Sequence, residues 1–126
     1  FEDENLSIRE KISKVNDLIA NHEEEVANPI LNYIDSRADL KLIGKNKISN
    51  KNRAPTISFT SNIKSSKEIS NILVSNKIAT RNDNFYAWRC LKSLNIDTED
   101  GVVRLSMTHY NSKKETDHIL SILKKI

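Results

Sequence analysis

The sequence predicts an α/β fold: a two-layer sandwich in which helices pack on one face of a small, mostly antiparallel sheet of about four strands. Short segments with alternating apolar residues lie between longer segments whose apolar residues recur every three or four positions. The length of 126 residues suits a single core. The alternation of the strand segments leaves the second face of the sheet to solvent or to another domain. The predicted order is α-α-β-β-α-β-α-β-α.

The first part of the chain, residues 1–36, has a helical pattern. Its first apolar stripe has helical spacing and consists of Ile8, Ile12, Val15 and Ile19. The pattern restarts at Val26, and Pro29 follows within it. Because proline is tolerated only near the first turn of a helix or at a kink, we expect two helices, or one helix bent near residues 21–29.

The remaining elements alternate along the chain. Strands are predicted at 40–43, at 54–61, at 77–80 with its end at Arg81, and at 101–111; helices are predicted at 65–76, 85–96 and 112–126. Serine and glutamate three residues apart form capping boxes at Ser7–Glu10, Ser65–Glu68 and Ser112–Glu115. Residues 45–52 are predicted to be a polar loop and residues 81–84 a turn. The helix at 85–96 is expected to bury Ala87, Trp88, Leu91 and Leu94.

Composition restricts the class of protein. Charged residues make up 29% of the chain, and no apolar run is long enough to span a membrane. The one cysteine, Cys90, excludes an internal disulfide, suits a cytoplasmic location, and is expected to be buried. Two glycines in the whole chain exclude a glycine-rich phosphate-binding loop, and the few histidines and cysteines argue against a metal site.

Charge is distributed unevenly along the chain. Residues 1–40 hold 4 basic and 10 acidic side chains, whereas residues 41–126 hold 16 basic and 7 acidic ones. A basic body of this kind can bind an anion or nucleic acid, or its lysines can simply be solvated.

Arg104 is the first candidate binding residue. On an alternating strand, Val103 and Leu105 face the core, so Arg104 faces the opposite side. A guanidinium group suits bidentate hydrogen bonding to a carboxylate or a phosphate, although a structural salt bridge is the simpler interpretation.

A second group of candidates lies near the end of the preceding strand. Arg81, Asn84, Phe85 and Tyr86 could line a pocket next to the helix that follows. The alternative is that Phe85 is simply a core anchor. His109 is a further pocket-lining candidate, although we expect it to shape the junction with the last helix rather than to transfer a proton.

Four motifs then occur together: RAPTISF at 53–59, IATR at 78–81, NFYA at 84–87 and GVVRLSMTHYNSKKETD at 101–117. With them the chain resembles the C-terminal small domain of the class V aminotransferases, which use pyridoxal phosphate, and especially the cysteine desulfurase-like proteins among them. The resemblance divides the chain into a helical segment, 1–36, that leads from a large domain, and the small domain, 37–126. It covers nearly the whole chain but about the last third of a typical family member.

The resemblance implies that the catalytic machinery lies elsewhere. In that family the large domain supplies the Schiff-base lysine, the aromatic residue on the cofactor ring and the aspartate on the pyridine nitrogen. Pyridoxal phosphate is therefore expected in the full-length protein, an enzyme, but not on this chain alone, and no catalytic residue is expected here. Arg104, by its place in VVRLS, matches the arginine that holds the substrate's α-carboxylate. The implied partners are the large domain of the same polypeptide, an amino-acid substrate and a second subunit of a homodimer, with no nucleic acid and no membrane.

One departure from the family pattern concerns the reaction. Cysteine desulfurases carry a nucleophilic cysteine in the loop after the strand that ends near Arg81; here Tyr86 stands about at that position, and Cys90 comes four residues later. Persulfide chemistry requires an exposed, activated thiolate. The resemblance therefore does not predict desulfurase activity, and aminotransferase, lyase or other chemistry at Cα or Cβ stays open.

Two other functions remain alternatives. One is a stand-alone anion-binding or regulatory α/β module. The other is RNA binding, which would require an aromatic platform on the sheet, where Phe59 is the only aromatic residue in a predicted strand interior. The chain begins at Phe1 without methionine, which suggests a piece of a longer protein.

Overall fold

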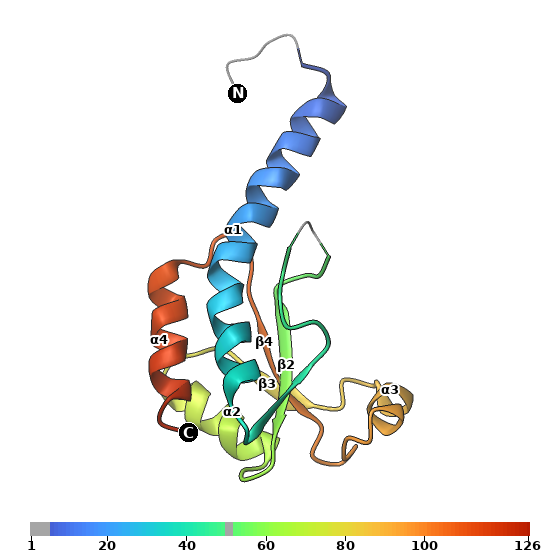
Figure 1. The fold of residues 1–126 in the computed structure, drawn as a ribbon, viewed down its shortest axis with the longest axis vertical. Helices are drawn as coiled ribbons and strands as arrows, with labels where there is room; N and C mark the ends of the chain where they lie inside the picture. The colour runs from blue at the N-terminus through green and yellow to red at the C-terminus, as the bar shows by residue number, and fades with distance from the viewer. Residues whose placement is uncertain (1–5, 50–51) are drawn as a thin grey trace.

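A computed structural model of the protein describes residues 6–49 and 52–126, and Figure 1 shows its helices and sheet. The elements of the described residues are α1 (Ile8–Ser36), β1 (Leu40–Ile43), β2 (Thr56–Ser61), α2 (Ser66–Ser75), β3 (Arg81–Asp83), α3 (Trp88–Ser93), β4 (Val102–Ser106) and α4 (Lys113–Leu123). The predicted α/β class is therefore confirmed, with four strands in one sheet. No helix in this part of the chain is long and apolar enough to cross a membrane.

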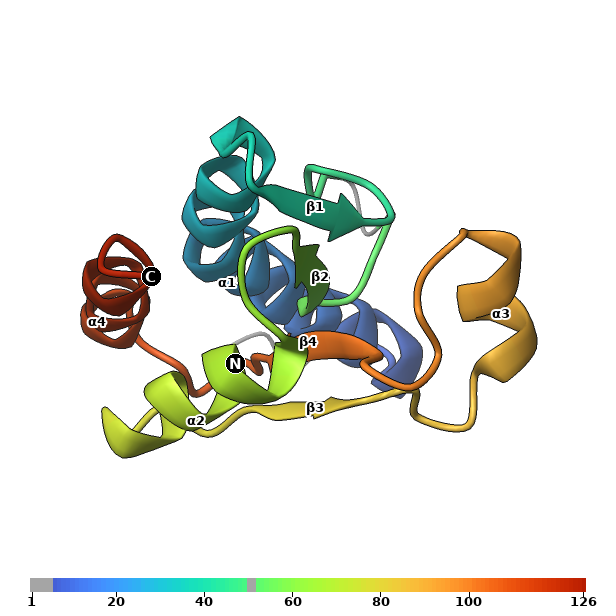
Figure 2. The ribbon, with the colours of Figure 1, turned by 90° about the horizontal axis from the view of Figure 1, so that it is seen from below.

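The sheet has the order β1-β2-β4-β3, and each neighbouring pair is antiparallel. The inner face of its central strands is fully or almost fully buried through Ile57, Phe59, Val103 and Leu105. Helices α1, α2 and α4 contribute to the same core, and the short α3 stands across the sheet from α4 (Figure 2). Because Phe59 is buried, its ring offers no stacking surface of the kind that RNA binding would require.

Helix α1 is one continuous helix, so of the two alternatives that the sequence left open, two helices is wrong and a single helix is correct. Pro29 lies inside it with an exposed side chain. The neighbouring residues Val26, Ile30 and Ile34 are completely buried against the sheet and α4. This burial outweighs the hydrogen bond that proline cannot donate. The first half of α1 extends beyond the sheet (Figure 1), and its side chains Ile8 and Ile12 are exposed.

The three predicted capping boxes are present at the N-termini of α1, α2 and α4. The serine and glutamate side chains of each box satisfy backbone N–H groups that the first turn leaves free. The polar loop predicted at 45–52 includes residues 50–51, which lie outside the described residues. Within the loop, Ile48 is buried, and its backbone N–H and C=O both bond to the Asn28 side chain, at 2.8 and 3.0 Å.

The third strand begins later than the sequence predicted, because residues 77–80 do not pair with a neighbouring strand. Lys77 has a positive φ of 62° and ends α2, and the backbone N–H of Ile78 bonds back to Leu73 at 3.0 Å. Residues 77–78 therefore form the C-terminal cap of α2 instead of the beginning of the predicted strand. The predicted turn at 81–84 is wrong over its first three residues, which pair with β4 as strand β3.

Helix α3 is only six residues long and buries one side chain, Leu91. The expected burial of Trp88 and Leu94 was wrong, since they are 46% and 41% exposed, and Ala87 is only partly buried. Cys90 is exposed as well, contrary to prediction. Helix α3 contacts the rest of the protein on one side only, where Leu91 packs with Ile96 and Val102 in a small second cluster. Its other side chains therefore stay exposed or partly exposed.

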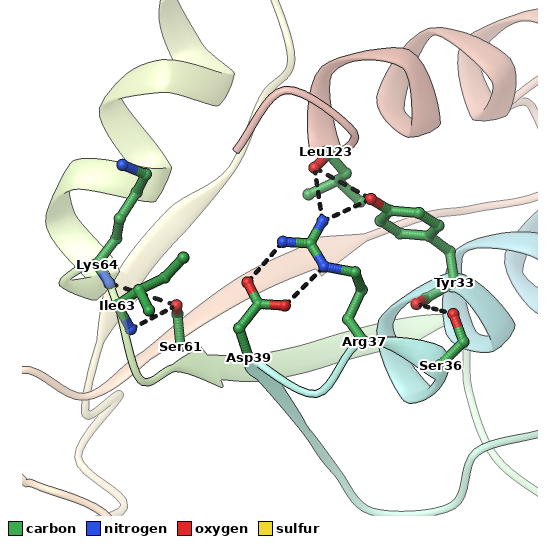
Figure 3. Close-up of polar contacts among 8 residues, drawn as sticks. All are labelled: Tyr33, Ser36, Arg37, Asp39, Ser61, Ile63, Lys64 and Leu123. Atoms are coloured by element: carbon green, nitrogen blue, oxygen red, sulfur yellow. Dashed lines mark hydrogen bonds and ion pairs between the residues drawn. The ribbon is translucent and has the colours of Figure 1, made fainter.

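A polar network joins the end of α1 to β1 and to the C-terminal end of α4 (Figure 3). The Arg37 guanidinium donates to both carboxylate oxygens of Asp39, at 2.6 and 2.5 Å, and to the hydroxyl of Tyr33 at 2.7 Å. The Tyr33 hydroxyl donates to the carbonyl oxygen of Leu123 at 3.4 Å. Because the hydrogen bonds from Arg37 favour the ionised carboxylate, they lower the pKa of Asp39.

Candidate functional site

The candidate site lies on the outer face of the sheet, opposite the core. Strand pairing sets Ser58 of β2, Arg104 of β4 and Arg81 of β3 directly opposite one another. Directly opposed residues of antiparallel strands point to the same face. Since Val103 and Leu105 fill the core, this row faces outward, as the sequence predicted for Arg104. Two arginines from neighbouring strands are thus brought together.

Arg81 and Arg104 line a pocket of about 540 Å³. Thr80 and Ser106 add hydroxyl groups to its wall, and Lys77 adds a third cationic side chain. The remaining lining side chains are apolar and come from Val74, Ile78 and Ala79. The described lining contains no carboxylate, so the pocket is a cationic one with hydrogen-bond donors. The site residues predicted from the sequence do not include Lys77, Thr80 or Ser106, although alternation along β4 places Ser106 on the same face as Arg104.

Arg104 is half-buried, and an aromatic ring supports it. Its guanidinium carbon lies 4.0 Å from the centroid of the Phe85 ring, a cation–π contact. The Thr80 hydroxyl donates to the backbone oxygen of Arg104 at 2.8 Å and ties β4 to the start of β3. No carboxylate of the described residues forms an ion pair with Arg104. The salt-bridge interpretation of Arg104 therefore finds no partner here.

Phe85 is held over Arg104 by an unusual turn. Phe85 and Tyr86 have positive φ angles of 51° and 60°, a conformation that non-glycine residues adopt only with outside support. Asn84 supplies that support: its side-chain oxygen accepts from the N–H of Tyr86 at 3.0 Å, and its side-chain amide donates to Thr98 at 3.3 Å. The turn is thus tied to the neighbouring loop.

A second contact, between Gly101 and the backbone of residues 83–84, restrains the same turn. Gly101 has a φ of +70°, and a Cβ atom there would stand only 2.3 Å from the backbone carbon of Asp83. Only glycine allows this close approach. Next to it, the Asp100 carboxylate accepts from the backbone N–H of Ser66 at 2.9 Å, at the start of α2. The start of helix α2, the end of strand β3 and the loop before β4 are therefore held together.

The other predicted site residues lie outside the pocket lining. The Tyr86 side chain is 97% exposed beyond the turn. His109 is exposed past the end of β4, where its ring meets Tyr110 edge-on at 5.3 Å. Asn84 acts on the backbone of the turn, and Phe85 on Arg104. Whether these four residues line a larger site in the complete protein stays a prediction.

Pyridoxal phosphate, which the resemblance implies, can be tested against these residues. That cofactor needs an amine for its aldehyde, an acidic group for its ring nitrogen and a flat surface for its ring. The described pocket lining offers neither a carboxylate nor an aromatic ring, and the Phe85 ring is already occupied by Arg104. These residues do not by themselves fit the cofactor. Within residues 6–49 and 52–126 there is also no cluster of side chains suited to a metal ion.

Comparison with known proteins places the chain. Residues 10–119 match the family described as Aminotransferase class-V. The chain belongs to this aminotransferase family. A curated relative, the aminotransferase-like protein FGM3 of Gibberella zeae, is 30% identical to this class V chain over 111 residues, which are 87% of the chain and 28% of FGM3.

Solved structures of cysteine desulfurases share the fold of this class V chain. The apo cysteine desulfurase from Thermococcus onnurineus matches with a TM-score of 0.74 at 23% identity, over 86% of this chain and 26% of that protein. The cysteine desulfurase CsdA from Escherichia coli matches with a TM-score of 0.69 at 16% identity, over 84% of this chain and 24% of that protein. The class V chain thus spans about a quarter of the length of each of these relatives.

Proposed function

We propose that this chain is the C-terminal small domain of a pyridoxal-phosphate-dependent enzyme that acts on an amino acid, and that Arg104 binds the substrate's α-carboxylate. The observation that carries the proposal is the Arg104 side chain itself. It lines a pocket, an aromatic ring supports its guanidinium, and no carboxylate of the described residues neutralises it. A planar guanidinium can form two parallel hydrogen bonds to a carboxylate, which fixes both the position and the orientation of the substrate.

Two features support a missing larger part. The chain spans 28% of FGM3 and 26% of the Thermococcus onnurineus desulfurase. In addition, the first half of α1 exposes Ile8, Ile12 and Leu18 at 79%, 55% and 63%, although these side chains lie on a well-capped helix. Apolar side chains gathered on one projecting segment are typical of a surface that packs against further protein. We propose that α1 leads from the large domain and packs against it.

In this arrangement the cofactor is held by the large domain, and this chain contributes substrate binding. The segment 81–88 lines or gates the complete site, since it carries both Arg81 and the Phe85 ring. The large domain would hold the pyridoxal phosphate, which would supply the electron-withdrawing chemistry at the substrate's Cα. We further propose a homodimeric, cytoplasmic protein, for which the exposed thiol of Cys90 suits a reducing compartment.

Kinetics of the full-length protein test the proposal. Replacing Arg104 with alanine removes the hydrogen bonds and the charge that hold the carboxylate, so KM for the amino-acid substrate should rise about 10- to 100-fold. Arg104→Lys should recover part of the loss, because it restores the charge without the planar fork. Arg89→Ala, which removes an exposed arginine of α3 outside the pocket, is the matched control and should leave KM unchanged. Unchanged kinetics in Arg104→Ala would refute the assignment.

A further inference from the structure

Arg81 is the second cation of the pocket, and the proposed function gives its positive charge no ligand. It stands directly opposite Arg104 in the β3–β4 register and lines the same pocket. Like charges directly opposite each other on antiparallel strands destabilise a sheet unless something neutralises them. The chain therefore carries a repulsive pair where a neutral residue on β3 would cost nothing.

The surrounding residues do not relieve this repulsion. Asp83 lies two residues along β3 on the same face, but its carboxylate accepts from the backbone N–H of Asn84 at 2.7 Å and forms no ion pair with either arginine. Lys77 adds positive charge to the same pocket. The described lining thus holds three cationic side chains and no anionic one, which is the charge pattern of a site for a ligand with more than one negative charge.

The two arginines also differ in how strongly their surroundings restrain them, which suggests different roles in binding. Arg104 is half-buried, its guanidinium packs on the Phe85 ring, and the Thr80 hydroxyl bonds to its backbone oxygen, so these contacts restrain it. Arg81 is exposed at the sheet edge. A rigid guanidinium suits the α-carboxylate, whose position is the same in every amino acid. An adaptable guanidinium one strand away suits a group whose position depends on the length of the side chain.

We infer that the site selects amino acids with a second anionic group in the side chain, and that Arg81 binds that group while Arg104 holds the α-carboxylate. This inference rests on the proposed function. Its ligand class is a dianion whose two acidic groups are separated by a short chain, such as a dicarboxylic amino acid. Arg81 would then be a specificity-determining residue, because a neutral side chain would leave its guanidinium unpaired next to that of Arg104.

Calorimetric titration of the full-length protein tests this with ligands that lack an amino group and so are not turned over. Succinate and glutarate are compared with their monoamides, succinamate and glutaramate, which keep the shape but lose one charge. At least one dicarboxylate should bind about tenfold more tightly than its monoamide. In Arg81→Gln this preference should fall below about twofold while monoamide binding stays unchanged; Arg104→Gln should weaken both ligands, and Arg89→Gln neither.

The outcomes separate the inference from the proposed function. If neither dicarboxylate binds more tightly than its monoamide, or if Arg81→Gln weakens both members of a pair equally, the inference is overturned. The proposed function survives that result as long as Arg104→Gln still weakens binding or raises KM for the amino-acid substrate. If Arg104→Gln changes neither quantity, the proposed function fails instead.

Discussion

At the scale of single residues, the Phe85 ring over Arg104 is the contact on which the site depends most. The turn that carries the ring holds two non-glycine residues at positive φ, and it persists because Asn84 and the close approach of Gly101 fix its backbone. A ring held in this way restricts the guanidinium to one region of the pocket before a ligand arrives. Binding then loses less side-chain entropy.

Phe85→Leu tests this role, because leucine keeps apolar volume but lacks the aromatic face. A cation–π contact contributes about 0.5–1 kcal/mol at an exposed position, so KM for the amino-acid substrate should rise about two- to fivefold with little change in kcat. Phe85→Tyr, which restores the ring, should behave like the wild type in the same steady-state assay. A Phe85→Leu enzyme with wild-type KM would show that the ring does not position Arg104.

The sequence could predict half of this residue-scale picture. Alternation along β4 predicts which face Arg104 occupies, because the core needs Val103 and Leu105. The sequence cannot predict that Phe85 contacts Arg104. That contact depends on the conformation of the turn at 85–86, which residues 84 and 101 of two different loops restrain. The pairing of Arg81 with Arg104 was hidden for a related reason: the sequence placed the strand four residues too early.

At the scale of elements, the network around Arg37 joins α1 to α4 through Tyr33 and Leu123 and includes Asp39 of the connection between α1 and β1. Its pH dependence follows from Asp39. Because Arg37 lowers the pKa of Asp39 in the folded protein, the unfolded chain binds more protons near that pKa. The stabilisation is therefore complete above the unfolded pKa of about 3.9, and it is lost as the pH falls through the lower folded pKa.

Asp39→Asn should consequently destabilise the protein at neutral pH and make little difference in strong acid. Urea unfolding of both proteins at about pH 7 and at a pH below the folded pKa measures the two differences. Other carboxylates also lose stabilisation in acid, namely those of the capping boxes, but they are common to both proteins and cancel. A difference between wild type and variant that is the same at both pH values would contradict this account.

Element prediction succeeded where local chemistry decides and failed where tertiary contacts decide. The capping boxes at Ser7, Ser65 and Ser112 are local and are present as predicted. Pro29, in contrast, is tolerated because the residues before and after it in α1, such as Val26 and Ile30, are buried in the core. The apolar spacing of 85–96 predicted a buried helix, but α3 stands at the end of the sheet, where only Leu91 finds neighbours.

At the scale of the whole molecule, helices close one face of the sheet, whereas the other face is covered only in part, by the small cluster of Leu91, Ile96 and Val102. The core between the sheet and the helices α1, α2 and α4 is closed, and Thr116 of α4 donates to the Val26 carbonyl of α1 at 2.9 Å across it. The opposite face carries the arginine pocket, and the first half of α1 carries an exposed apolar stripe. If the chain is the small domain of a larger enzyme, as proposed above, these two surfaces are the ones expected to face the large domain.

The most direct test of the central claim removes the carboxylate and the arginine in turn. The affinity of the full-length protein for its amino-acid substrate is compared with its affinity for the corresponding amine, which lacks the α-carboxylate, in wild type and in Arg104→Gln. If Arg104 holds the carboxylate, the substitution should weaken amino-acid binding about 10- to 100-fold and leave amine binding within about twofold, so that the two changes are not additive. Equal weakening of both ligands, or of neither, would contradict the account.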